Sequence, residues 1–115
     1  MKLYHTTSSE RADSIKAHGF RDTEGSYGFV REDGSPFYIR GVFLSDAPLG
    51  PNDGLLDASQ VFVIEIPERM IGPYELIEEG QGKGYREWCV PAEVVNKYFS
   101  KRVPLGLYDL MFRLP

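Results

Sequence analysis

The strand-like runs of this sequence are short, and turn residues rather than long helical stretches separate them. The strongest run covers residues 61–66 (VFVIEI) and ends at Pro67, and residues 41–45 (GVFLS) form another. Parallel strands need crossover connections of a dozen or more residues, usually helical. Because no such connection follows these runs, we expect an α+β fold with a mostly antiparallel sheet.

One main helix is predicted near the N-terminus, directly after a short strand over residues 2–6. Thr7 is the expected N-cap, and Glu10 would complete a capping box with it. Ala12 and Ile15 give the helix an apolar stripe, and Gly19 is expected to end it. The N-terminus of this helix would then point back toward the first strand.

The rest of the chain divides into turns and further short elements. The turn-rich segments are residues 21–40, read as turns or a loose hairpin around 27–30 and 37–39, then 46–54 and 81–84. The additional short strands are expected over residues 74–77, 86–90 and 103–112. A brief helix over residues 92–96 is expected to begin after Pro91.

Composition narrows the class of protein. The 115 residues, 42% of them hydrophobic, predict a single domain over residues 1–115, and the net charge of -4 argues against a surface that grips phosphates. A single cysteine, Cys89, excludes an intrachain disulfide and favours a reducing compartment. The sequence has no signal-peptide pattern and no run near the roughly 20 apolar residues that span a bilayer. We therefore expect a cytoplasmic protein with no membrane partner.

Polar residues on the predicted strands are the candidates for a site. His5 lies in the first strand, and Glu87 lies where another strand enters the fold. An inward carboxylate is costly unless it is paired or functional. The structural alternatives are a packed ring for His5 and, for Glu87, a salt bridge at the rim with Arg86 or Lys83. Cys89 shares the expected face of Glu87 and is more simply a buried, inert thiol.

Several common site patterns are not matched. Neither Gly-x-x-x-x-Gly-Lys nor Gly-x-Gly-x-x-Gly occurs, so residues 80–84 (GQGKG) are interpreted as a hinge. His5 and His18 are the only imidazoles and are widely spaced, so we expect no metal site. No serine lies in a Gly-x-Ser-x-Gly elbow, which argues against a serine nucleophile.

Three stretches, taken in order, match the motifs of one known superfamily. Residues 3–7 (LYHTT) resemble a first-strand motif Leu-(Trp/Tyr)-His-Gly-(Ser/Thr), and residues 41–46 (GVFLSD) resemble Gly-(Ile/Val)-Tyr-(Phe/Leu)-(Ala/Ser)-(Asp/Glu). Residues 86–90 (REWCV) resemble a strand with the pattern Glu-(Tyr/Trp)-x-(Val/Ile). Together they resemble the ADP-ribosyltransferase superfamily, in its diphtheria-toxin and poly(ADP-ribose) polymerase branch, and especially small uncharacterised bacterial or phage-type members.

The resemblance implies a compact single-domain fold with a split, mostly antiparallel sheet, and NAD+ as substrate without a metal. His5 would bond the adenine-side ribose, the Thr6 backbone would face the nicotinamide carboxamide, and Phe43 would stack on the nicotinamide ring. Ser45 would complete the cofactor-binding set. Glu87 would be the catalytic residue, binding the 2'-hydroxyl of the nicotinamide ribose and stabilising an oxocarbenium-like transition state.

Two departures from the motifs keep alternatives open. Thr6 replaces a glycine, and Phe43 replaces a tyrosine and so keeps the ring but not the hydroxyl. Arginine-modifying relatives carry a Glu-x-Glu pair, but here Tyr85 stands two positions before Glu87. Arginine is therefore a less favoured acceptor.

We expect an NAD+-dependent mono-ADP-ribosyltransferase, or an NAD+ glycohydrolase, whose acceptor is a protein, a nucleic acid or water. The first alternative is a catalytically inactive module that binds a nucleotide, ADP-ribose or a protein through the same cleft. An RNA 2'-phosphotransferase relative would need more arginines and histidines around the cleft than this acidic chain suggests. A plain structural or interaction domain is the remaining reading.

Overall fold

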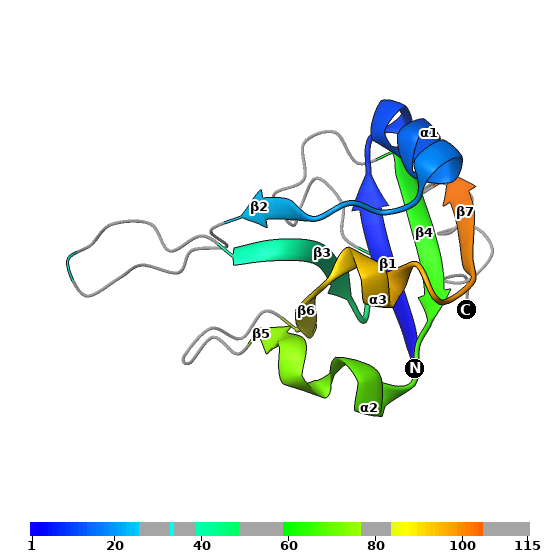
Figure 1. Cartoon of the computed structure of the whole chain (residues 1–115). Coiled ribbons are helices and arrows are strands. Elements are labelled where there is room, and N and C mark those ends of the chain that lie inside the picture. Colours follow the sequence, from blue (N-terminus) through cyan, green and yellow to red (C-terminus); the bar gives the residue numbers. More distant parts are fainter. Residues whose placement is uncertain (26–32, 34–38, 49–58, 77–83, 105–115) are drawn as a thin grey trace.

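The computed structural model describes residues 1–25, 33, 39–48, 59–76 and 84–104 (Figure 1). Its strands are β1 (Lys2–Thr7), β2 (Thr23–Gly25), β3 (Ile39–Ser45), β4 (Gln60–Glu65), β5 (Glu75–Leu76), β6 (Glu87–Val90) and β7 (Ser100–Pro104). Its helices are α1 (Ser9–His18), α2 (Glu68–Ile71) and α3 (Ala92–Val95), with a 3₁₀ turn over Gly72–Tyr74. The architecture is α+β, and all pairs among these described strands are antiparallel, which agrees with the mostly antiparallel sheet that was expected.

The strands follow the order β5-β6-β3-β1-β4-β7, and β2 pairs with β3 outside this path. β1 pairs with β4 along its whole length, from Lys2 opposite Glu65 to Thr7 opposite Gln60. In contrast, the ladder between β1 and β3 consists of a single residue pair, Tyr4 opposite Ser45. Figure 1 shows β3 turning away from β1 toward β2, so the sheet opens between two well-paired halves.

Alternation along the strands separates two apolar clusters. The larger one gathers buried side chains from both halves of the sheet, among them Leu3, Leu44 and Trp88, with residues of all three helices. The smaller one, around Tyr4, lies on the opposite face of β1. Phe43 and Ser45 alternate with core residues of β3, so they face away from the larger cluster.

The helix near the N-terminus forms as predicted, but its N-cap is one residue later. Thr7 still pairs with Gln60 in the β ladder, so it ends β1 instead of capping the helix. Ser8 is the N-cap, and its hydroxyl oxygen accepts a hydrogen bond from the Arg11 N–H at 3.2 Å. Gly19 ends the helix as predicted, with a φ of 81° that favours glycine.

Most predicted strands are confirmed within a residue or two, namely those expected over residues 2–6, 41–45, 61–66 and 86–90. The brief helix after Pro91 is also confirmed. β5 begins one residue later than predicted, β7 begins three residues early, and α2 and the 3₁₀ turn were not predicted. A hairpin partner for β3 exists as β2, with Gly25 opposite Ile39.

Several expectations lie outside the described residues: the hairpin around 27–30 and 37–38, most of the loop over 46–54, residue 77 of the strand over 74–77, the hinge over 80–83 and the strand beyond 104. None of the described helices is long and apolar enough to span a bilayer.

Candidate functional site

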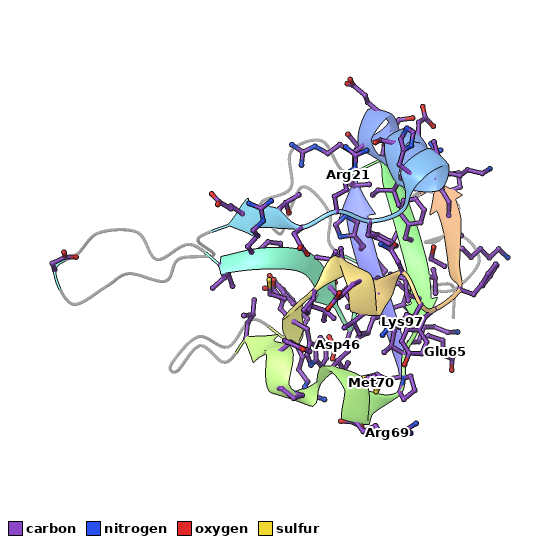
Figure 2. All side chains as sticks on the ribbon, viewed as in Figure 1. Arg21, Asp46, Glu65, Arg69, Met70 and Lys97 are labelled. Atoms are coloured by element: carbon purple, nitrogen blue, oxygen red, sulfur yellow. The ribbon has the colours of Figure 1, made fainter. Side chains whose placement is uncertain are left out.

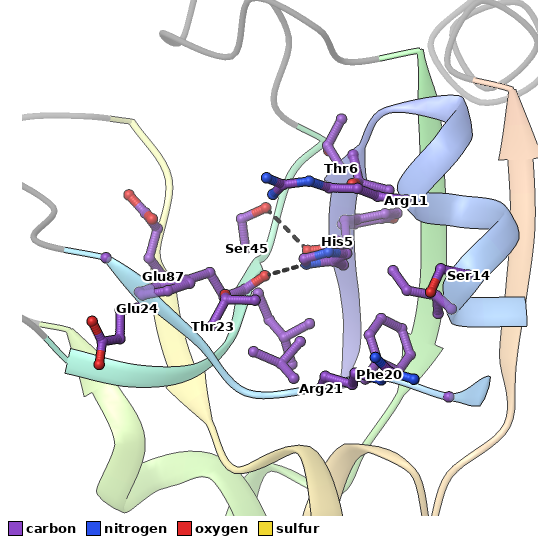
Figure 3. A pocket seen from close by; sticks show the side chains of 18 residues that line it. His5, Thr6, Arg11, Ser14, Phe20, Arg21, Thr23, Glu24, Ser45 and Glu87 are labelled. Atoms are coloured by element: carbon purple, nitrogen blue, oxygen red, sulfur yellow. Dashed lines mark hydrogen bonds between the residues drawn. The ribbon is translucent and has the colours of Figure 1, made fainter.

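A pocket of about 470 Å³ lies where β1 and β3 diverge (Figure 3). Its walls come from β1, α1, the segment after α1, β2 and β3, with Glu87 contributed by β6. The five residues assigned from the sequence all line it: His5, Thr6, Phe43, Ser45 and Glu87. Small-molecule sites in proteins have volumes of roughly 300–1,000 Å³, so the pocket is large enough to hold most of a nucleotide.

The imidazole of His5 bridges the opening in the sheet. Its Nδ1 donates a hydrogen bond of 2.8 Å to the Phe43 carbonyl oxygen, and a carbonyl can only accept, so Nδ1 carries the proton. Burial lowers the pKa of His5 below 6.5; the Phe43 bond partly offsets this, and the positive charge of Arg11 lowers it further. The ring is therefore neutral at pH 7, which leaves Nε2 as a hydrogen-bond acceptor.

We expect His5 to make the free energy of unfolding fall as the pH drops below about 6.5. The pKa is lowered in the folded protein, so in the window below 6.5 the unfolded chain binds the extra proton. The stabilisation is fully present above pH 6.5 and is lost as the pH falls through the folded-state pKa. Urea unfolding between about pH 8 and about pH 5 measures this slope.

His5→Asn is the matched control for that slope. The asparagine side-chain nitrogen can take the place of Nδ1 as donor to Phe43, but it does not titrate in this range. The part of the slope that His5 contributes should therefore disappear. An unchanged slope in His5→Asn would show that other groups carry the pH dependence.

Glu87 is buried, with 5% of its surface exposed, and it lines the pocket from the first position of β6. Its ladder partner is Ser45, also buried, whose hydroxyl donates to the Ala47 carbonyl at 2.6 Å. The ion pairs of Arg86 are made with Glu75 at 2.7 Å and Glu68 at 4.0 Å. Glu87 therefore occupies an interior position rather than the rim, whereas Lys83 lies outside the described residues.

Phe43 and Thr6 also line the pocket. Phe43 is partly buried and lies opposite Cys89 in the ladder between β3 and β6. Cys89 is buried, and burial raises the pKa of its thiol, which keeps it protonated at pH 7. Thr6 pairs with Val61 of β4, so its backbone already belongs to a ladder.

Two arginines that the sequence reasoning did not assign also line the pocket. Arg11 comes from the first turns of α1 and Arg21 from the segment after it. Figure 3 shows the Arg11 side chain extending from α1 past His5. Neither forms an ion pair within the described part of the chain, whereas Arg40, Arg86 and Arg102 do. The sequence did contain one signal for Arg11. The helix predicted shortly after His5 brings its first turns, which carry Arg11, to the same pocket.

The pocket therefore combines an interior carboxylate, a neutral hydrogen-bond acceptor and two arginines that have no carboxylate partner among the described residues. Such a set fits a ligand that carries anionic groups at one end and develops positive charge at the other. Among the residues that the structure describes, no group of three or more His, Cys, Asp or Glu side chains is placed to hold a metal ion.

Comparison with protein families, curated proteins and solved structures found no match for this chain.

Proposed function

We propose that this protein cleaves the nicotinamide–ribose bond of NAD+, as a mono-ADP-ribosyltransferase or an NAD+ glycohydrolase on an ADP-ribosyltransferase-like fold. The observation that carries the proposal is the shared pocket. His5, Phe43 and Glu87 come from three strands that are far apart in the sequence, and they line one cavity together with two arginines. The opening of the sheet between β1 and β3 supports the same fold assignment.

Glu87 suits the reacting end of the substrate. When the bond between ribose C1' and nicotinamide breaks, its electron pair leaves with the neutral nicotinamide and the ribose acquires oxocarbenium character. A carboxylate in an interior position stabilises this charge as it develops, because little water screens it there. The acceptor then forms a bond to C1' and loses a proton.

The remaining polar groups suit the rest of the dinucleotide. The two arginines match the diphosphate, because guanidinium groups bind phosphate oxygens through charge-assisted hydrogen bonds. Nε2 of His5 can accept a hydrogen bond from a ribose hydroxyl. The ring of Phe43 supplies a face for the nicotinamide.

A catalytically inactive module that binds the same ligand is the second candidate. Thr6 lines the pocket where the family motif has glycine, and a larger residue at this position favours the inactive module. An RNA 2'-phosphotransferase gains some support from the arginines at the pocket, although the net charge of -4 disfavours a long nucleic-acid contact.

The proposal is tested by incubating the protein with NAD+ and following nicotinamide release, together with calorimetric binding of NAD+, ADP-ribose and adenosine. We expect turnover, binding of both diphosphate compounds and weaker binding of adenosine. Arg11→Ala should weaken ADP-ribose binding about tenfold or more, since hydrogen bonds to charged groups contribute about 1.5–3 kcal/mol, and should leave adenosine binding nearly unchanged.

Arg69→Ala is the control, because Arg69 is an exposed arginine of α2, remote from the pocket (Figure 2). Binding without turnover would select the inactive module, and transfer of the 2'-phosphate from phosphorylated RNA to NAD+ would select the RNA enzyme. If NAD+ neither binds nor reacts, the proposal is wrong.

A further inference from the structure

The segment that follows α1 is attached to α3 by a side chain from the far end of the sequence. The Asn96 Oδ1 accepts a hydrogen bond of 2.8 Å from the Phe20 N–H, and its Nδ2 donates one of 2.9 Å to the Phe20 carbonyl. One amide side chain thus satisfies both backbone groups of one residue, as a neighbouring strand would. Among the side chains, only asparagine and glutamine carry a donor and an acceptor side by side in this way.

Two neighbours of Phe20 strengthen this attachment. The Asp22 Oδ1 accepts a hydrogen bond of 2.8 Å from the Ala92 N–H at the start of α3. Gly19 leaves room for the amide, because a Cβ atom there would lie 3.1 Å from the Asn96 Oδ1. The segment is therefore held at both ends of α3, which follows directly after β6 and its Glu87.

The position of Phe20 matters because its ring is the support of His5. Phe20 is buried and meets the His5 imidazole edge to face, with ring centroids 5.4 Å apart and an interplanar angle of 88°. The Phe20 ring also meets the Phe62 ring at the same centroid distance. His5 thus has two anchors: the Phe43 carbonyl, which fixes one ring nitrogen, and Phe20, which fixes the plane of the ring.

We infer that Asn96, which does not line the pocket, is a positioning residue for it: its amide holds Phe20, and Phe20 holds the imidazole of His5 facing the pocket. The ligand that the pocket takes rests on the proposed function, but the positioning is a property of the protein itself. Through α3, the same contacts connect the His5 side of the pocket with the strand that carries Glu87.

The test compares Asn96→Ala and Asn96→Asp with Lys97→Ala, whose exposed side chain lies next along the chain (Figure 2). Asn96→Ala removes both bonds to Phe20. Asn96→Asp keeps the acceptor but sets a carboxylate oxygen against the Phe20 carbonyl. The first readout is NMR of the His5 ring nitrogens, which reports the tautomer and the titration of His5 without any ligand. The charged groups that share the pocket with His5 during this titration are Arg11, Arg21, Glu24 and Glu87.

We expect both Asn96 variants to shift the His5 ring resonances and to move its pKa back up toward 6.5, as water reaches the loosened ring. Lys97→Ala should leave both unchanged. Where NAD+ turnover is measurable, the Asn96 variants should lower it roughly 10- to 100-fold, as expected for a misplaced binding group.

The outcomes separate the two proposals. His5 resonances that stay in place in a folded Asn96 variant would overturn the positioning role, whatever the enzyme assay shows. Shifted resonances in a protein that does not bind NAD+ would support the positioning role and reject the proposed function. If Asn96→Ala fails to fold, Asn96→Asp, which keeps one of the two bonds, decides the question. Loss of folding in both would overturn the role, because Asn96 would then be required by the whole fold rather than by the pocket.

Discussion

Glu87→Gln is expected to reduce nicotinamide release from NAD+ by about 10²- to 10³-fold while leaving the protein folded, a loss typical of removing one preorganised electrostatic group from an active site. The substitution keeps the shape of the side chain and replaces a negative charge by a neutral amide. Because the carboxylate acts on positive charge that develops only in the transition state, kcat should fall much more than NAD+ affinity.

The position of Glu87 makes this substitution informative. Glu87 has 5% of its surface exposed and lies opposite the buried Ser45 in the ladder. Water therefore has little access to its side chain. A neutral glutamine should be tolerated at such a place, because it keeps nearly the shape and volume of the glutamate side chain. The melting temperature of Glu87→Gln should therefore stay near that of the original chain.

Glu65→Gln is the matched control, since it removes the same charge from an exposed position at the end of β4. The measurement is nicotinamide release at saturating NAD+, with Kd determined separately by calorimetry. Full activity in Glu87→Gln would remove Glu87 from the reaction, and a parallel loss in Glu65→Gln would mean that net charge, not position, was being tested.

The strand pattern of this chain was readable because alternation and turn residues are local properties. In β3, Val42 and Leu44 belong to the larger apolar cluster whereas Phe43 between them does not, as a period of two requires. The N-cap was missed for an equally local reason. Thr7 and Ser8 are both good caps, and the choice between them was made by Gln60, which pairs with Thr7 from a strand far along the chain.

The candidate site could be assembled from the sequence only in part. His5 and Glu87 were proposed from a resemblance to known motifs and both line the pocket, but the hydrogen-bond partner of His5 is a backbone carbonyl 38 residues away, which no side-chain pattern marks. Arg11 and Arg21 became pocket residues through the packing of α1 and the segment after it. Asn96 is a stronger case, because its role depends on a contact across 76 residues.

Trp88→Ala is expected to lower the free energy of unfolding by about 3–5 kcal/mol, the usual cost of truncating a large aromatic in a core. Trp88 is the largest of the fully buried side chains, with 1% of its surface exposed, and it lies opposite Leu44 in the ladder between β3 and β6. Domains of this size have total stabilities of about 5–15 kcal/mol, so this single change should remove a large share of the total.

Arg86→Ala provides the comparison, because Arg86 makes the most conspicuous polar contacts beside the same strand. Its guanidinium donates two hydrogen bonds to Glu75, at 2.9 and 2.7 Å, and lies 4.9 Å from the centre of the Trp88 ring. Exposed ion pairs are screened by water and salt, so we expect a much smaller loss than for Trp88→Ala. Urea unfolding of both variants at low and high salt makes the distinction: the effect of Arg86→Ala should shrink with salt, whereas that of Trp88→Ala should persist. If Arg86→Ala were the more damaging change, β6 and its Glu87 would be held in place by the surface ion pair rather than by the buried indole.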